Sequence, residues 1–199
     1  MFQSMGLEVY GSDLSDSMLG QARMNIGEVN IPLQKVDYRE LAEHYEVEFD
    51  ALVCLTNSIN ECLEDSETLR SLRSMKAVLR TGGILVFDQG QTDASMQNPP
   101  RFVPILNNRN FTRIFTMEYS GDVQTVNIFD FIHTEDTSDF KHSCVQIRIR
   151  LFDGWHKILH EAGFDEVRFF GDWDSTPYDK ASSRRLIAVA KKGIAQSDL

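Results

Sequence analysis

The sequence lacks the features that mark secreted and membrane proteins. Its 199 residues include three cysteines, which lie far apart and form no CxxC pair, so neither a disulfide framework nor a zinc site is indicated. No apolar run approaches the roughly 20 residues that span a bilayer, and the N-terminus carries no basic-then-apolar signal pattern. We therefore expect a reduced, cytoplasmic protein without a membrane partner.

An excess of basic residues is also absent. Asp and Glu number 30 against 20 Lys and Arg, which gives a net charge of -10 and a pI of about 4.9. Such a surface repels phosphate backbones and disfavours a nucleic-acid partner, unless a local basic patch exists. Basic neighbours occur only as pairs, at Arg184-Arg185 and Lys191-Lys192.

Short apolar strands and helices alternate over the first ninety residues. Strands are expected at residues 7–14, 31–36, 49–55 and 84–88. A first helix is expected after Ser15, which caps it. A second is expected over residues 38–45, and a third over residues 66–79, which Thr81-Gly82-Gly83 is expected to end. Strands that are apolar throughout suit a sheet buried on both faces. The alternation predicts an α/β fold with a Rossmann-like, doubly wound mixed sheet.

A different texture occupies residues 102–151, which are rich in β-branched and aromatic side chains. Three or four antiparallel strands are expected there. A helix over residues 154–162 then leads to a final antiparallel pair at residues 167–171 and 185–190. Because no linker or repeat interrupts the chain, we expect one domain over residues 1–199, in which the β-rich insertion covers the functional site.

Several short stretches, in order and at fitting spacing, resemble class I S-adenosylmethionine-dependent methyltransferases. VYGSDLSDSML is similar to the family's second strand and the turn after it, and QKVDYREL to its third strand. The family's fourth strand and its loop resemble FDALVCLTNSIN. The next helix, the turn and the fifth strand resemble LRSMKAVLRTGGILVFD. The late helix and the sixth strand resemble HKILHEAGFDEVRFFGDW. The LTNSIN loop and the β-rich insertion look most like small-molecule N-methyltransferases of the glycine/sarcosine type. The resemblance implies S-adenosylmethionine as cofactor and a small metabolite that is methylated on nitrogen or, as the second choice, on oxygen.

The resemblance places the cofactor ribose at Asp13. A carboxylate at the carboxyl end of a strand, where α/β sheets bind ligands, can accept hydrogen bonds from both ribose hydroxyls. Leu14 and Met18 would line the adenine pocket. The alternatives are an aspartate that only caps the next helix and, for Met18, a place in the helix core.

Two further strand ends complete the implied site. Asp37 would lie near the adenine amino group and Tyr38 would offer its backbone N–H to the ring, unless Asp37 is a strand-end acid in solvent. Leu55 and Thr56 would face the methionine part of the cofactor. Asn57 is the candidate catalytic residue, because its side chain can donate and accept hydrogen bonds and so can orient a neutral amine. Its alternative role is in an Asn-Ser turn.

One position departs from the glycine-type enzymes, which carry an arginine shortly after the fifth strand to hold the substrate carboxylate. Here the stretch is DQGQTD, with Gly90 at that position, which argues against glycine as the substrate. Arg101 lies nearby, with a surface cation as its alternative role. His156 and His160 flank KIL without the acid of an HExxH motif, so we expect no metal site.

The Gly-rich turn with which the methyltransferase fold begins, commonly DxGxGxG, has no counterpart in the sequence. Residues 1–6 align with the end of the helix that follows this turn, so the first strand is expected to be missing too. In the family that strand separates the second from the fourth, and residues 7–14 and 49–55 should therefore not pair. We expect such a chain to bind S-adenosylmethionine poorly and to self-associate, which leaves a homo-oligomer open, and about forty upstream residues to restore binding.

Two other hypotheses stay open. A non-catalytic protein of the same fold, as a remnant or partner subunit, would also lack the Gly-rich turn. A nicotinamide-binding oxidoreductase would also carry an acid at Asp13, but LRTGGILVFD and the EAGF helix do not fit it. Methyl transfer needs mainly alignment and desolvation, because the donor is already activated, so an enzyme requires no strong acid–base constellation here.

Overall fold

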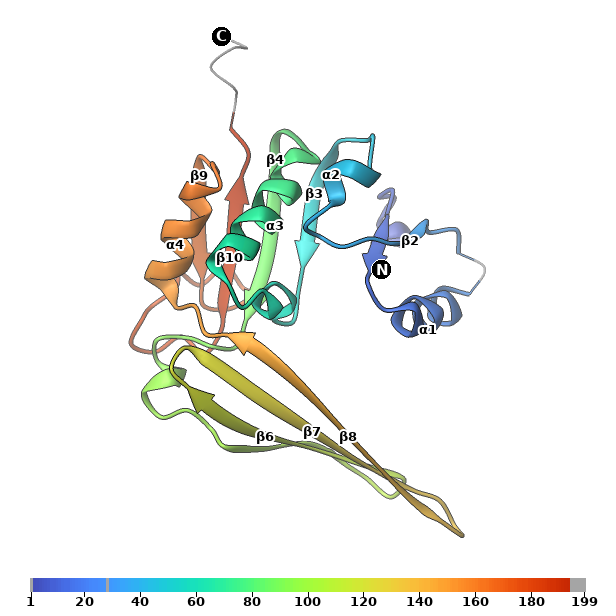
Figure 1. Ribbon diagram of the computed structural model, residues 1–199. Helices are drawn as coiled ribbons and strands as arrows, with labels where there is room; N and C mark the ends of the chain where they lie inside the picture. Colours follow the sequence, from blue (N-terminus) through green and yellow to red (C-terminus); the bar gives the residue numbers. More distant parts are fainter. Residues whose placement is uncertain (1, 28, 194–199) are drawn as a thin grey trace.

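The computed structural model describes residues 2–27 and 29–193. The described strands form a central four-stranded sheet, a two-stranded sheet beside it and a long twisted sheet below it, as Figure 1 shows. This arrangement confirms the predicted α/β fold with an antiparallel β insertion.

The central sheet is mixed and has the order β3-β4-β10-β9. Its strands are β3 (Phe49–Cys54), β4 (Leu79–Gln89), β9 (Glu166–Phe170) and β10 (Leu186–Lys191). β3 and β4 run parallel, whereas β10 runs antiparallel to both β4 and β9. The predicted antiparallel pair at the end of the chain is therefore confirmed, and β9 forms the edge.

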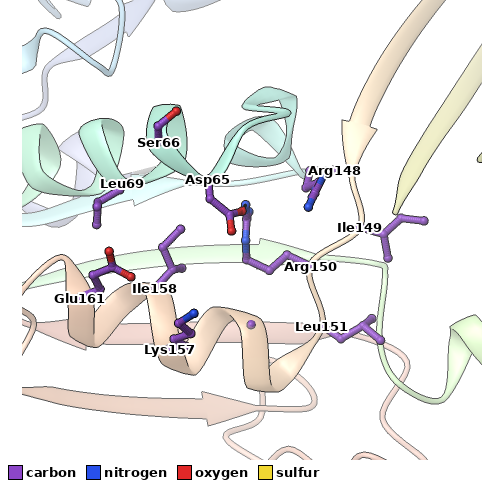
Figure 2. Close-up of a pocket in the computed structure, with 11 residues that line it drawn as sticks. Asp65, Ser66, Leu69, Arg148, Ile149, Arg150, Leu151, Lys157, Ile158 and Glu161 are labelled. Carbon is purple, nitrogen blue, oxygen red and sulfur yellow. Dashed lines mark hydrogen bonds and ion pairs between the residues drawn. The ribbon is translucent and has the colours of Figure 1, made fainter. Parts of the chain in front are cut away.

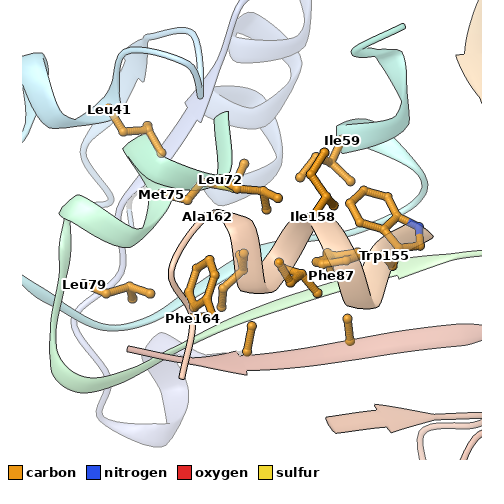
Figure 3. Packing of buried hydrophobic residues seen from close by; sticks show 14 of the residues in the cluster. Leu41, Ile59, Leu72, Met75, Leu79, Phe87, Trp155, Ile158, Ala162 and Phe164 are labelled. Atoms are coloured by element: carbon orange, nitrogen blue, oxygen red, sulfur yellow. The ribbon is translucent and has the colours of Figure 1, made fainter. Parts of the chain in front are cut away.

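Helices α3 (Asp65–Ala77) and α4 (Phe152–Glu161) cover the same face of the central sheet (Figure 1). Phe87 of β4 and Trp155 of α4 are fully buried there, with ring centroids 4.5 Å apart. Figure 3 shows these rings among the aliphatic side chains of α3 and α4. Each fully buried large apolar side chain stabilises the fold by about 1.5–3 kcal/mol, so this layer is the main core.

The other described helices are short or lie at the side of the molecule. They are α1 (Asp16–Ile26), α2 (Leu41–His44) and the 3-10 helices η1 (Gln3–Met5), η2 (Ser58–Glu61) and η3 (Ser95–Gln97). The predicted cap of α1 is confirmed, because the Met18 N–H donates to Ser15 Oγ at 3.3 Å.

The predicted helix end at Thr81-Gly82-Gly83 is wrong. α3 ends at Ala77, and these residues belong to the first part of β4. Gly82 has φ +78° and its N–H donates to the Lys192 carbonyl at 2.8 Å. A Cβ on Gly83 would lie 3.0 Å from the Phe49 carbonyl oxygen. The glycines therefore allow close backbone approach within the sheet instead of ending a helix. The helix predicted over residues 38–45 is also shorter than expected, because only Leu41–His44 are helical.

The insertion is a four-stranded antiparallel sheet with the order β5-β6-β7-β8, which confirms the strands predicted there. Its strands are β5 (Phe102–Asn107), β6 (Phe111–Ser120), β7 (Val123–His133) and β8 (Ser138–Arg148). β8 leads directly into α4, so one end of this sheet lies against the central domain (Figure 1).

The two-stranded sheet stands apart from the central one. β1 (Gly11–Asp13) and β2 (Leu33–Lys35) pair in parallel, and within the described residues no ladder joins them to β3. The expectation that β1 and β3 do not pair is therefore confirmed. Tyr10 and Phe49 bridge one end with ring centroids 5.4 Å apart, while Val53 of β3 remains 45% exposed.

Candidate functional site

The loop after β3 has an unusual backbone. Thr56 and Asn57 are consecutive non-glycine residues with φ of 61° and 65°. Such left-handed conformations are uncommon, above all for a β-branched residue such as threonine. Residues of this kind persist only where the surroundings hold them, and they gather at functional sites.

The end of β4 holds this loop in place. Asp88 is 2% exposed, and its Oδ1 accepts from the Thr56 N–H at 2.7 Å. The other carboxylate oxygen pairs with Arg185. The Asn57 side-chain oxygen accepts from the Gly90 N–H at 3.0 Å. The Asn57 amide nitrogen therefore remains as the donor that this side chain can offer to a bound molecule.

The loop after β1 exposes the groups that were predicted to hold the cofactor. Asp13 Oδ1 accepts from the Ser15 N–H at 2.8 Å, so this carboxylate supports the start of α1. Leu14 is 51% and Met18 57% exposed, so Met18 does not belong to the helix core. A carboxylate and two exposed apolar side chains are therefore found within six residues at the end of β1 and the start of α1.

The loop after β2 is partly occupied by its own ion pair. Asp37 accepts from the Arg39 guanidinium at 2.6 Å, and these hydrogen bonds are the main cause that lowers the pKa of Asp37. Asp37 is therefore not a solvated acid. The Tyr38 hydroxyl donates to the Ser58 carbonyl at 3.2 Å, so this side chain supports the loop that carries Asn57.

Glu61, at the end of η2, is a candidate that sequence patterns did not reveal. The residue is exposed overall. The pKa of Glu61 is raised, mainly because part of its carboxyl is removed from water and secondly by the charge of Asp13. The loops after β1 and β3 therefore each carry a carboxylate, Asp13 and Glu61. Asp13 and Glu61 are 48 residues apart in the sequence, and no local motif indicates this pairing.

A cavity of about 220 Å³ joins the β3 loop to the insertion sheet. Its lining combines residues from the loops after β3 and β4 with one face of β6, β7 and β8. The lining residues are Thr56, Asn57, Glu61, Gln91, Phe115, Met117, Gln124, Val126, Ile128, Val145 and Ile147. The insertion therefore contributes one wall of this cavity, and its role as a cover over the site stays a prediction. Leu55 is 37% exposed beside the cavity, whereas the exposed Arg101 does not line it.

A chain of buried amides leads from the cavity into the core. Gln91 Nε2 donates to Gln124 Oε1 at 2.8 Å, and Gln89 Nε2 donates to the Gln91 carbonyl. The Trp155 indole N–H donates to Gln89 Oε1 at 2.8 Å. This chain fixes the Gln91 amide against the hydrophobic core. Its Oε1 is buried and has no hydrogen-bond partner among the described residues.

A second cavity, of about 570 Å³, lies between α3 and α4 (Figure 2). Arg150 crosses it and donates to Asp65 at 2.6 Å and to Thr68 at 3.2 Å. Its guanidinium also lies 4.8 Å from the Trp155 ring centroid. These contacts tie the end of the insertion to the start of α3, which makes a structural role the simplest account of this cavity.

Comparison with known proteins agrees with this architecture. A family model described as a methyltransferase domain matches residues 1–83. The chain is 26% identical over 196 residues to glycine/sarcosine N-methyltransferase from Aphanothece halophytica, covering 94% of this chain and 69% of that protein. It is also 26% identical to glycine/sarcosine/dimethylglycine N-methyltransferase from Actinopolyspora halophila, of which it spans only 34%.

Solved structures show the same fold. An S-adenosylmethionine-dependent methyltransferase from Clostridium acetobutylicum superposes with a TM-score of 0.83 at 15% identity, covering 94% of this chain and 76% of that one. The sugar N-methyltransferase KedS8 from Streptoalloteichus gives a TM-score of 0.74 at 21% identity, covering 93% and 71%. The chain is therefore similar to S-adenosylmethionine-dependent methyltransferases, in sequence to the relatives named above and in fold to these structures. Within that class, the curated relatives named above are N-methyltransferases of small amino acids.

Proposed function

We propose that this protein transfers a methyl group from S-adenosylmethionine to a nitrogen, or as the second choice an oxygen, of a small metabolite. The observation that carries the proposal is the cavity under the insertion sheet, because Thr56 and Asn57 of the strand-end loop line it directly. A small acceptor in this cavity would meet the loop that faces the cofactor in the family.

The exposed groups beyond β1 fit the cofactor that this class uses. The Asp13 carboxylate can accept from a ribose diol, and the exposed Leu14 and Met18 can flank an adenine ring. Leu55 and Thr56 would contact the methionine part, and the Tyr38 backbone N–H the adenine ring. Asp37 can serve the adenine amino group only if one of its oxygens accepts that group in addition to Arg39. When bound, S-adenosylmethionine supplies an activated methyl group.

Asn57 would orient the acceptor. Its backbone is fixed by Asp88 and its side-chain oxygen by Gly90, so the free amide nitrogen points from a rigid support. A held donor of this kind can bind an acceptor atom of the ligand away from the reacting nitrogen and so align that nitrogen with the methyl group, and alignment is a large contribution that the protein can make to this reaction.

The direct test incubates the protein with methyl-labelled S-adenosylmethionine and a panel of small amines and alcohols, followed by mass spectrometry. Label should appear on nitrogen, and Asn57→Ala should lower kcat/KM by about 10- to 100-fold, the scale of one lost orienting hydrogen bond. Transfer to no member of the panel would contradict an enzymatic role.

A non-catalytic binding or partner role is the second candidate. Within the described residues the β1-β2 sheet forms no ladder with the central sheet, and this separation of the strands favours it. Saturable cofactor binding without any methyl transfer would support this role. A cytoplasmic location rests on composition alone and stays a prediction. Within the described residues, no helix is long and apolar enough to cross a membrane.

A further inference from the structure

The cavity under the insertion sheet has one wall that is almost wholly apolar. Phe115 pairs with Ile128 and Met117 with Val126 across β6 and β7, and Val126 pairs with Val145 across β7 and β8. All of these residues line the cavity, as does Ile147. Side chains at alternate positions of neighbouring strands share one face, so the wall is continuous. It suits the hydrocarbon part of a ligand.

The opposite wall is polar and carries a single charge. Glu61 is the only ionisable residue among the eleven that line the cavity, and none of the eleven is lysine, arginine or histidine. The buried Gln91 Oε1 lacks a hydrogen-bond partner among the described residues. Both groups accept hydrogen bonds, and an unsatisfied buried acceptor is costly, so a ligand that donates would be favoured.

We propose that the cavity binds a small amine carried on an apolar body, and that Glu61 holds the amine. The statement that the bound amine is methylated rests on the proposed function. The binding of the amine can be measured without cofactor. A free amino acid such as glycine would bring a carboxylate into a cavity whose only charge is negative. Like charges at short range repel, so the site selects against such a substrate.

The same arrangement accounts for the proton of the reaction. An amine enters as an ammonium ion beside Glu61 and gives one proton to that carboxylate. The freed lone pair forms the new N–C bond, and the bonding pair of the broken C–S bond stays on sulfur. The products are the thioether and the methylated ammonium ion, and Glu61 returns its proton to water through the open side of its exposed carboxyl.

The test compares the binding of phenethylamine, 2-phenylethanol and glycine by titration calorimetry without cofactor. Phenethylamine should bind at least tenfold more tightly than either other compound. Glu61→Gln should remove the advantage of the amine over the alcohol. Glu64→Gln is the matched control, because Glu64 is also an exposed acid, at the start of α3, and does not line the cavity. This control should leave all three affinities unchanged.

Equal affinity of the wild-type protein for the amine and the alcohol would overturn the inference, even if Glu61→Gln failed to fold. Tighter binding of glycine would overturn it as well. Methyl transfer to phenethylamine, followed with labelled donor, would support both the inference and the proposed function. Amine binding without methyl transfer would refute the proposed function and the amine's role as methyl acceptor. Methylation of glycine alone would leave the proposed function in place and refute only the claim that the substrate is an amine on an apolar body.

Discussion

The Asp13 carboxylate has two candidate roles. Its Oδ1 accepts from the Ser15 N–H, which supports the start of α1, while the position at the end of β1 suits a ribose diol. The two roles are compatible, because a carboxylate has several lone pairs. They differ in what a substitution removes.

Asp13→Ala should weaken cofactor binding by about 1.5–3 kcal/mol, the scale for hydrogen bonds to a charged group. Ser15→Ala is the control, because it removes the cap of α1 and costs about 1 kcal/mol of stability, yet leaves the ribose contact in place. Calorimetry with S-adenosylmethionine and thermal unfolding of both variants separate the two roles. If the affinities of both variants fall equally, Asp13 acts only through the helix.

A substitution at Gly90 can test whether the missing arginine explains why glycine is not expected as the substrate. A Cβ on this residue meets nothing within 4 Å, so Gly90→Arg is sterically allowed. The arginine would stand where glycine-type enzymes carry theirs and could form a charge-assisted hydrogen bond to a carboxylate, so we expect the affinity for glycine to rise about tenfold or more. Gly90→Gln is the neutral control, and the same gain in this variant would refute a charge effect.

At the scale of elements, the turn between β2 and α2 depends on Asp37 and Arg39. Because the hydrogen bonds of Arg39 lower the pKa of Asp37, the ionised carboxylate is more favoured in the folded than in the unfolded state. The resulting stability is present at neutral pH and is lost as the pH falls through the normal aspartate range, near 4, to the lowered folded value.

Asp37→Asn should therefore cost about 1.5–3 kcal/mol of unfolding free energy at pH 7 and progressively less as the pH falls below about 4. Urea unfolding at several pH values measures this difference. Asp50→Asn, which removes an acid that is 82% exposed and paired with Arg80, should cost under about 1 kcal/mol at every pH. A loss for Asp37→Asn that does not change with pH would contradict the ion-pair account.

The strained loop after β3 depends on the end of β4. Asp88→Ala removes the acceptor of the Thr56 N–H and the partner of Arg185, so stability should fall by about 3 kcal/mol. If the loop also orients the acceptor, kcat should fall more than KM rises. Arg185→Ala keeps the Thr56 contact and is expected to destabilise without the same loss of kcat, while equal kinetic losses would argue against a positioning role.

At the scale of the whole molecule, the patterns that repeat along the chain were predictable. Apolar runs, β-branched and aromatic segments and apolar residues at helical spacing located the strands and the main helices, and the Ser15 cap follows from its neighbours. The role predicted for Thr81-Gly82-Gly83 is wrong, because Gly83 contacts Phe49 and Gly82 contacts Lys192, which lie 34 and 110 residues away in the sequence.

The site was only half predictable for the same physical reason. Asn57 and Asp13 end strands and follow a recognisable local pattern. The contact of Asp88 with Thr56 spans 32 residues and that of Gln91 with Gln124 spans 33, so only the folded chain brings them together. The acid that ends ILVFD was a usable signal for Asp88, since strand ends carry the site in this fold.

Within the described residues β3 is an edge strand of the central sheet. Because an open strand edge can pair with a second copy of the chain, we expect self-association. Val53→Lys places a charge on that strand, where Val53 is 45% exposed, and should shift light scattering toward monomer. Val47→Lys is the matched control, because Val47 is equally exposed but lies outside the strand. Loss of association in both variants, or a monodisperse wild-type monomer, would contradict association through this edge.

The central claim is that the groups at the ends of β1 and β3 bind S-adenosylmethionine, and titration calorimetry of the 199-residue protein tests it most directly. We predict saturable binding, which Asp13→Ala reduces at least tenfold and Asp16→Ala does not. No detectable binding heat at millimolar cofactor, or equal affinities for the wild-type protein and Asp13→Ala, would contradict it.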